Sequence, residues 1–258
     1  MDSIFVFDSG SGGEFVTKEV LRALPQENFV LYKDVKNCPY SIKSKTKLWH
    51  ICCKIMNIAT REMKPKAIVV ACNTMSSLFE RKIIKKFNSV PIFFVTPLIT
   101  NKILLQKTLV LATTRTVNCN EDILKAKGNK NCIVVGFDNL AKMIDLAKDS
   151  SKVEADIKLL LLNSLSKYKT AGVKNIVLGC THYKYIKKYL QEIFGKVKFY
   201  DKSKFVAQEL RAYLQSSNFV QDKILPNKNL KMMFKNQVIV VEDIKELRLL
   251  AQRNIKEY

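Results

Sequence analysis

The same succession of strand-like and helix-like segments occurs twice in this chain. This repeat restricts the fold more than any other feature. Short runs rich in Val, Ile and Phe are each followed by a polar turn and then by a stretch with helical periodicity. This alternation is typical of α/β proteins with mostly parallel sheets. The expected strands are Ile4–Phe7, Phe29–Tyr32 and Ala67–Ala71 in the first series, and Thr108–Leu111, Cys132–Val135 and Asn175–Gly179 in the second.

The two series also keep a similar spacing. Asp8 and Cys72 lie 64 residues apart in the first series, and Thr113 and Cys180 lie 67 apart in the second. The third strands read KAIVVACNT and KNIVLGCTH. We interpret this as an internal duplication that gives two similar, doubly wound domains. Because open α/β sheets bind ligands beyond the carboxyl ends of their strands, Cys72 and Cys180 are expected on opposite walls of one cleft.

The crossing between the domains is expected near Pro97, since proline ends regular structure and stiffens a connection. The second domain is predicted to span residues 98–210. The first is predicted to comprise residues 1–97 together with 211–258, because the apolar run Val238–Val241 and the helical pattern after it are expected to return to the first sheet.

Composition excludes several classes of protein. With 258 residues and 47% hydrophobic content the chain can form a large core, and no window approaches the roughly 18 apolar residues that a membrane span needs. We therefore expect a soluble, cytoplasmic protein. The seven cysteines are odd in number and form no CxxC pair, so reduced thiols are expected rather than disulfides or a zinc site.

The formal net charge of +21 raises the question of an acidic partner such as nucleic acid or an anionic membrane. The basic residues are scattered through helix-like stretches and are not interleaved with aromatic residues as in a nucleic-acid-binding strip. A solvated surface is the favoured interpretation. A basic nucleic-acid-binding or regulatory protein stays open as an alternative.

Two cysteines at equivalent strand ends suit a particular reaction. Removing the α-proton of an amino acid without a cofactor requires a base on one face of the carbon and an acid on the other. A thiol is partly ionised near neutral pH, so one cysteine can be the base while its partner is the acid. The glycine-rich turn Gly10–Gly13 lacks the Lys-Ser/Thr ending of a phosphate loop, and we reject that interpretation.

Five motifs in order, FDSGSGG, CPYS, ACNT, LATTRT and LGCTHY, resemble those of the cofactor-independent glutamate racemases of the aspartate/glutamate racemase superfamily. The similarity reaches to about residue 210. It implies two α/β domains with the active site between them, and interconversion of L- and D-glutamate with neither cofactor nor metal. It also implies a homodimer that supplies D-glutamate to cell-wall peptidoglycan.

The resemblance assigns roles residue by residue. Cys72 would exchange the α-proton on the D-glutamate side with support from Asp8, and Cys180 on the L-glutamate side with support from His182. The positions that would hold the ammonium and carboxylate groups of the substrate are Ser9, Pro39, Tyr40, Ser41, Asn73, Thr74, Thr116 and Thr181.

Two positions depart from the family pattern. Asp145, in LAKMIDLAK, replaces a glutamate and is one methylene shorter, which weakens the expectation that it supports the second cysteine. Ser41 replaces the glycine of a proline-tyrosine-glycine turn, and serine does not readily adopt the positive φ that glycine permits. A racemase for aspartate or another amino acid therefore stays open as a second alternative.

Overall fold

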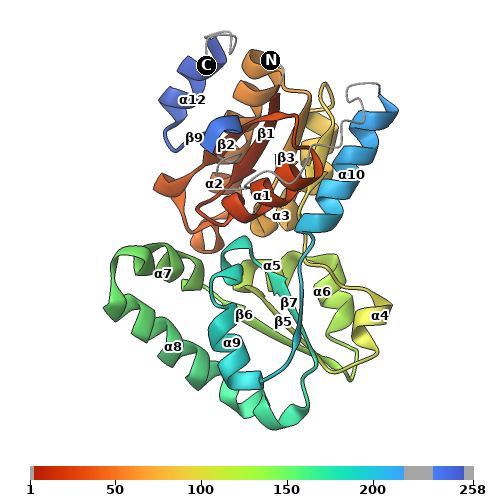
Figure 1. Ribbon diagram of the computed structural model, residues 1–258, viewed down its shortest axis with the longest axis vertical. Coiled ribbons are helices and arrows are strands. Elements are labelled where there is room, and N and C mark those ends of the chain that lie inside the picture. Colours follow the sequence, from red (N-terminus) through yellow and green to blue (C-terminus); the bar gives the residue numbers. More distant parts are fainter. Residues whose placement is uncertain (1–2, 218–234, 253–258) are drawn as a thin grey trace.

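The computed structural model describes residues 3–217 and 235–252, and its two parallel sheets lie one above the other along the longest axis (Figure 1). The first sheet has the order β4-β3-β1-β2-β9, with β1 Ser3–Asp8, β2 Asn28–Lys33, β3 Ala67–Val70, β4 Ile92–Phe94 and β9 Val238–Val241. The second has the order β6-β5-β7-β8, with β5 Thr108–Thr113, β6 Cys132–Phe137, β7 Asn175–Gly179 and β8 Lys198–Tyr200.

The strand order is the same in both sheets once β9 is set aside. The series β4-β3-β1-β2 corresponds to β8-β7-β5-β6, and every paired strand is parallel to its neighbour. The predicted fold of two similar, doubly wound α/β domains is confirmed. The first sheet and its helices are called the first lobe below, and the second sheet and its helices the second lobe.

Alternating side chains divide the first lobe into two cores, because successive residues of a strand point to opposite faces. Phe5 and Phe7 pack on one face with α2, α3 and α12, whereas Ile4 and Val6 pack on the other with α1 and α10. The helices are α1 Gly13–Ala23, α2 Lys45–Asn57, α3 Asn73–Lys86, α10 Ser203–Ser216 and α12 Ile244–Gln252.

The second lobe repeats this arrangement. Leu109 and Leu111 face a core with α7, α8 and α9, and Val110 and Ala112 face a smaller one with α4, α5 and α6. The helices are α4 Asn101–Leu104, α5 Thr114–Cys119, α6 Glu121–Ala126, α7 Leu140–Leu146, α8 Ser151–Leu165 and α9 Lys187–Phe194.

Short helical segments connect these elements. Two of them, η2 and η6, border the cleft discussed below. The 3-10 segments are η1 Val35–Asn37, η2 Tyr40–Ile42, η4 Ala147–Asp149, η5 Ser166–Ala171 and η6 Thr181–Lys184, and η3 Ile58–Met63 is a π-helix. Among the described residues, no helix is both long and apolar enough to cross a membrane.

The chain returns to the first lobe after β8. Strand β9 pairs with β2 in parallel, with Val238 opposite Phe29. The return starts earlier, because Val206 and Leu210 of α10 are buried in the core that α1 covers (Figure 1). The division at residue 210 predicted above therefore falls inside a helix that packs on the first lobe.

Candidate active site

The carboxyl ends of the two sheets face each other across one pocket. Asp8 is the last residue of β1, Cys72 precedes α3 just beyond β3, and Cys180 stands between β7 and η6. Both cysteines line the pocket, one from each lobe. The lining residues are Ser9, Pro39, Tyr40, Ser41, Cys72, Asn73, Thr74, Thr113, Ala141, Cys180, Thr181 and His182.

Cys72 is held in a protonated state by its surroundings. Its Sγ lies 3.5 Å from Ser9 Oγ, and the side chain is almost completely buried. Burial, followed by the negative charge of Asp8, raises the pKa of the Cys72 thiol to about 12. At neutral pH Cys72 is therefore a neutral thiol that can donate a proton.

Cys180 has a different partner. The Sγ of Cys180 lies 3.8 Å from Nδ1 of His182, whose other ring nitrogen lies 3.2 Å from Asp145 Oδ2. Burial opposes the charged imidazolium, yet the contacts of His182 with Asp145 and Cys180 raise its pKa well above 6.5. A protonated His182 can donate a hydrogen bond from Nδ1 to the Cys180 sulfur.

Asp8 caps the glycine-rich turn. Its carboxylate accepts the backbone N–H groups of Gly10 (3.2 Å) and Gly13 (2.9 Å), and Thr181 Oγ1 lies 3.4 Å from it. Burial raises the pKa of Asp8 to about 6 despite the opposing charge of His182. In the described part of the chain its hydrogen bonds go to these groups, so its influence on Cys72 acts through charge.

Two glycines of that turn allow the second lobe to approach closely. A Cβ atom on Gly10 would lie 2.7 Å from both Asp145 Oδ2 and His182 Nε2, and one on Gly12 would lie 2.7 Å from the backbone N of His182. No side chain fits at these separations. The glycine-rich motif thus serves contact between the lobes, which agrees with the rejection of a phosphate loop.

Among the predicted substrate-binding residues, all but Thr116 line the pocket. Thr116 is fully buried, and its hydroxyl lies 3.2 Å from Thr74 Oγ1 and 2.9 Å from Thr113 Oγ1. Thr116 therefore lies behind these two pocket-lining residues. Thr113 was missed as a pocket residue. The repeat itself carried the signal, since Thr113 occupies in the second series the strand end that Asp8 occupies in the first.

Comparison with known proteins gives the family. No family model matches the chain. It is 30% identical over 219 residues to a glutamate racemase of Clostridium perfringens, which covers 82% of this chain and 83% of the relative. It is 31% identical over 217 residues to that of Clostridium acetobutylicum, with the same two coverages. This chain belongs to the glutamate racemase family.

Solved structures of glutamate racemases share the fold. The enzyme of Francisella tularensis in complex with D-glutamate superposes with a TM-score of 0.71 at 22% identity, covering 95% of this chain and 98% of the other. The Escherichia coli enzyme, in complex with L-glutamate and the activator UDP-MurNAc-Ala, gives 0.70 at 22% identity, with coverages of 96% and 92%. At a sequence identity of 22%, these two structures show that the chain shares their two-lobed fold.

The shorter carboxylate at position 145 still reaches His182 in this member of the glutamate racemase family. Asp145 Oδ2 contacts His182, and Oδ1 accepts a hydrogen bond from the hydroxyl of Ser11 in the opposite lobe. This hydrogen bond joins α7 to the turn after β1 across the cleft.

The serine that replaces the family glycine is also accommodated. Ser41 lies in η2, and the only non-glycine residue with positive φ in the described chain is Lys64, so this turn needs no glycine. The Ser41 hydroxyl donates to the carbonyl of Asp138 (2.6 Å), and its own carbonyl accepts from Arg115 Nε (2.8 Å). Ser41 thus joins the first lobe to the second at the edge of the pocket.

Proposed function

We propose that this protein interconverts L- and D-glutamate, with one of Cys180 and Cys72 removing the α-proton from one face and the other delivering a proton to the opposite face. The observation that supports this most strongly is that equivalent strand ends of two similar lobes bring one thiol each to the same pocket. A proton can then leave one face of the substrate carbon and another can arrive on the opposite face, which inverts the stereocentre.

The neutral thiol of Cys72 favours one direction for the first turnover. Cys180, beside protonated His182, would remove the α-proton of L-glutamate, and the proton would stay on the Cys180 sulfur. The neutral thiol of Cys72 would deliver its own proton to the other face and form D-glutamate. Cys72 is then the thiolate and Cys180 the thiol, the state required to convert D-glutamate back.

Neutral groups would hold the charged ends of the substrate. The side-chain oxygen of Asn73 is buried and has no hydrogen-bond partner in the described part of the protein, so a substrate ammonium can satisfy it. The N-terminus of α3 begins at Asn73, and backbone N–H groups of a first helical turn have no acceptor within the helix. They would bind a carboxylate, together with the hydroxyl of Thr74.

Deuterium incorporation tests the proposed reaction. Purified protein incubated with L-glutamate in deuterated water is expected to yield D-glutamate with deuterium at Cα, since the donating thiol exchanges with solvent. Chiral chromatography with mass detection measures both products. Folded protein that gives neither product from either enantiomer would refute the proposal, and a higher rate on aspartate than on glutamate would reassign the substrate.

We propose that the D-glutamate serves peptidoglycan synthesis, in keeping with the family resemblance, and that the protein works as a cytoplasmic homodimer. Its seven cysteines are all unpaired, and a mechanism with two free thiols needs the reducing conditions of that compartment. Sedimentation velocity would measure the oligomeric state.

The comparisons favour the racemase over the nucleic-acid-binding alternative, which would require steeply salt-dependent nucleic-acid affinity without turnover.

Ser41→Ala is expected to lower kcat/KM for glutamate by about 2- to 10-fold. The reason is the loss of the hydrogen bond to Asp138 that spans the cleft, since such a bond contributes about 0.5–1.5 kcal/mol. Initial rates from circular dichroism measure the effect. The matched control is Ser166→Ala, which removes a serine hydroxyl bonded within the second lobe and should leave kcat/KM unchanged. Equal effects of both substitutions would contradict a role for the Ser41 contact.

A further inference from the structure

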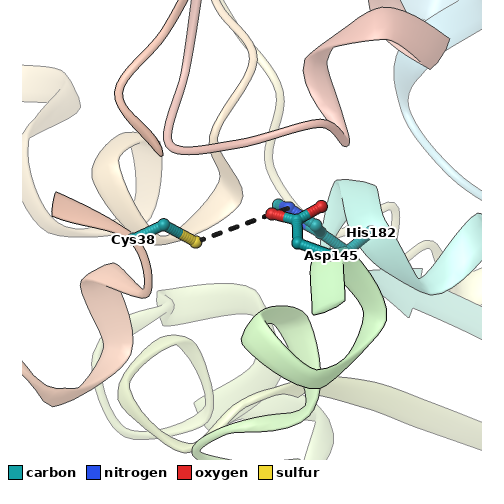
Figure 2. Close-up of side chains that lie close together, drawn as sticks. All are labelled: Cys38, Asp145 and His182. Atoms are coloured by element: carbon teal, nitrogen blue, oxygen red, sulfur yellow. Dashed lines mark hydrogen bonds and ion pairs between the residues drawn. The ribbon is translucent and has the colours of Figure 1, made fainter. Parts of the chain in front are cut away.

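Three metal-ligating side chains from distant parts of the sequence meet at the edge of the cleft. Cys38 precedes η2 in the first lobe, whereas Asp145 on α7 and His182 in η6 belong to the second. One ligand atom from each lies within 4.8 Å of the other two. Figure 2 shows the Cys38 thiol pointing from one side toward the carboxylate and imidazole on the other.

The separations fit a tetrahedral ion. Zinc binds sulfur at about 2.3 Å and nitrogen or oxygen at about 2.0–2.2 Å, so neighbouring ligand atoms around it lie about 3.3–3.7 Å apart. Cys38 Sγ lies 3.9 Å from Asp145 Oδ2, and that oxygen lies 3.2 Å from His182 Nε2. Movements of a few tenths of an ångström bring these two pairs to coordination distance.

We infer that Cys38, Asp145 and His182 form an inhibitory binding site for Zn²⁺ or a similar thiophilic divalent ion. Thiolate and imidazole ligands select zinc or cobalt, whereas magnesium and calcium prefer oxygen. Three protein ligands leave the fourth position for water. Binding releases the thiol proton of Cys38 and the Nε2 proton of His182 to solvent.

Inhibition follows from where the ion lies, because His182, one of its ligands, also contacts Cys180 through Nδ1 (3.8 Å). The ion also ties η2 of the first lobe to α7 and η6 of the second, and this holds the pocket closed against entry of substrate. The inhibitory effect rests on the proposed racemase activity, but binding of the ion does not.

Cobalt substitution tests binding separately from activity. Full-length protein is titrated with Co²⁺ under a phosphine reductant, because thiol reductants themselves bind metals. We expect sulfur-to-cobalt charge-transfer absorption in the near ultraviolet and intense visible bands of a tetrahedral site, competed by Zn²⁺ and unaffected by Mg²⁺. Cys38→Ala and Cys38→Ser should each weaken binding at least about tenfold, since even indirect supports of a metal site are worth 10- to 100-fold.

The control is Cys53→Ala, which removes a partly buried thiol of α2 outside the cluster and should leave cobalt binding unchanged. In the racemisation assay, Cys38→Ala should need at least about ten times more Zn²⁺ for half-inhibition than the wild type. Undiminished cobalt absorption or zinc sensitivity in both Cys38 variants would overturn the inference and place the ion on Cys72 or Cys180. Absence of the sulfur-to-cobalt band in folded wild-type protein would also overturn it, whether or not the protein racemises glutamate.

Discussion

Cys72→Ala and Cys180→Ala are each expected to lower kcat/KM for glutamate by about 1,000-fold or more. Each removes a group that exchanges the substrate proton on one face, and a positioned acid or base contributes about 10²–10⁴-fold to a rate. Loss of either partner stops the reaction, because a proton removed from one face must be replaced on the other. Circular dichroism with each enantiomer as starting material measures both directions.

The thermodynamics of racemisation provides an internal check on this experiment. The enantiomers have equal free energies in water, so kcat/KM must fall equally in both directions in any variant. The matched control, Cys53→Ala, removes a thiol of α2 that lies outside the pocket and should retain activity within about twofold. Substantial activity in either Cys72→Ala or Cys180→Ala would rule out the two-thiol scheme.

Asp8→Asn is expected to gain stability relative to the wild type as the pH rises from about 4 to about 7. Burial raises the pKa of Asp8 from 3.8 to about 6, so the folded protein holds this proton where the unfolded chain has released it. The stabilisation from the neutral form is fully present below pH ~3.8 and is lost as the pH rises through ~6. At about 1.4 kcal/mol per pH unit, the difference amounts to about 3 kcal/mol.

Urea unfolding of both proteins over this pH range measures the difference in free energy. Asp156→Asn, at an exposed position of α8, is the control and should show a flat difference. The same Asp8→Asn variant should lose racemase activity if the charge of Asp8 supports Cys72. A difference in stability between Asp8→Asn and the wild type that does not change with pH would show that the pKa of Asp8 is the same in the folded and unfolded protein, and it would contradict the raised pKa.

The strands and the repeat could be read from the sequence because they depend on local patterns. The runs Asn175–Gly179 and Val238–Val241 are predicted with the bounds that the structure gives. Apolar runs that end in polar turns specify buried parallel strands, and the position just beyond such a strand is fixed once the strand is known. The strand pattern alone therefore predicts that Cys72 and Cys180 lie at one cleft.

Side-chain environments could not be read in this way, since they arise between the lobes. The hydrogen bond of Ser41 to Asp138 joins residues that are 97 positions apart, and that of Ser11 to Asp145 joins residues 134 apart. Thr116 matched the family motif but does not line the pocket, because its buried hydroxyl contacts those of Thr74 and Thr113, which do. The packing of α10 was also not readable from the sequence, because residue 210, the predicted boundary, lies within this helix and its apolar face packs on α1.

The sequence by itself determined the class of fold, the duplication and the two thiols, since hydrophobic periodicity and strand-end chemistry are properties of short segments. Tertiary structure decided the surroundings of those thiols. Burial beside Asp8 raises the pKa of the Cys72 thiol, and the close approach of α7 across Gly10 places Asp145 against His182, which contacts Cys180. It also brought Cys38 to Asp145 and His182, a cluster without any spacing signature, because its members belong to different lobes.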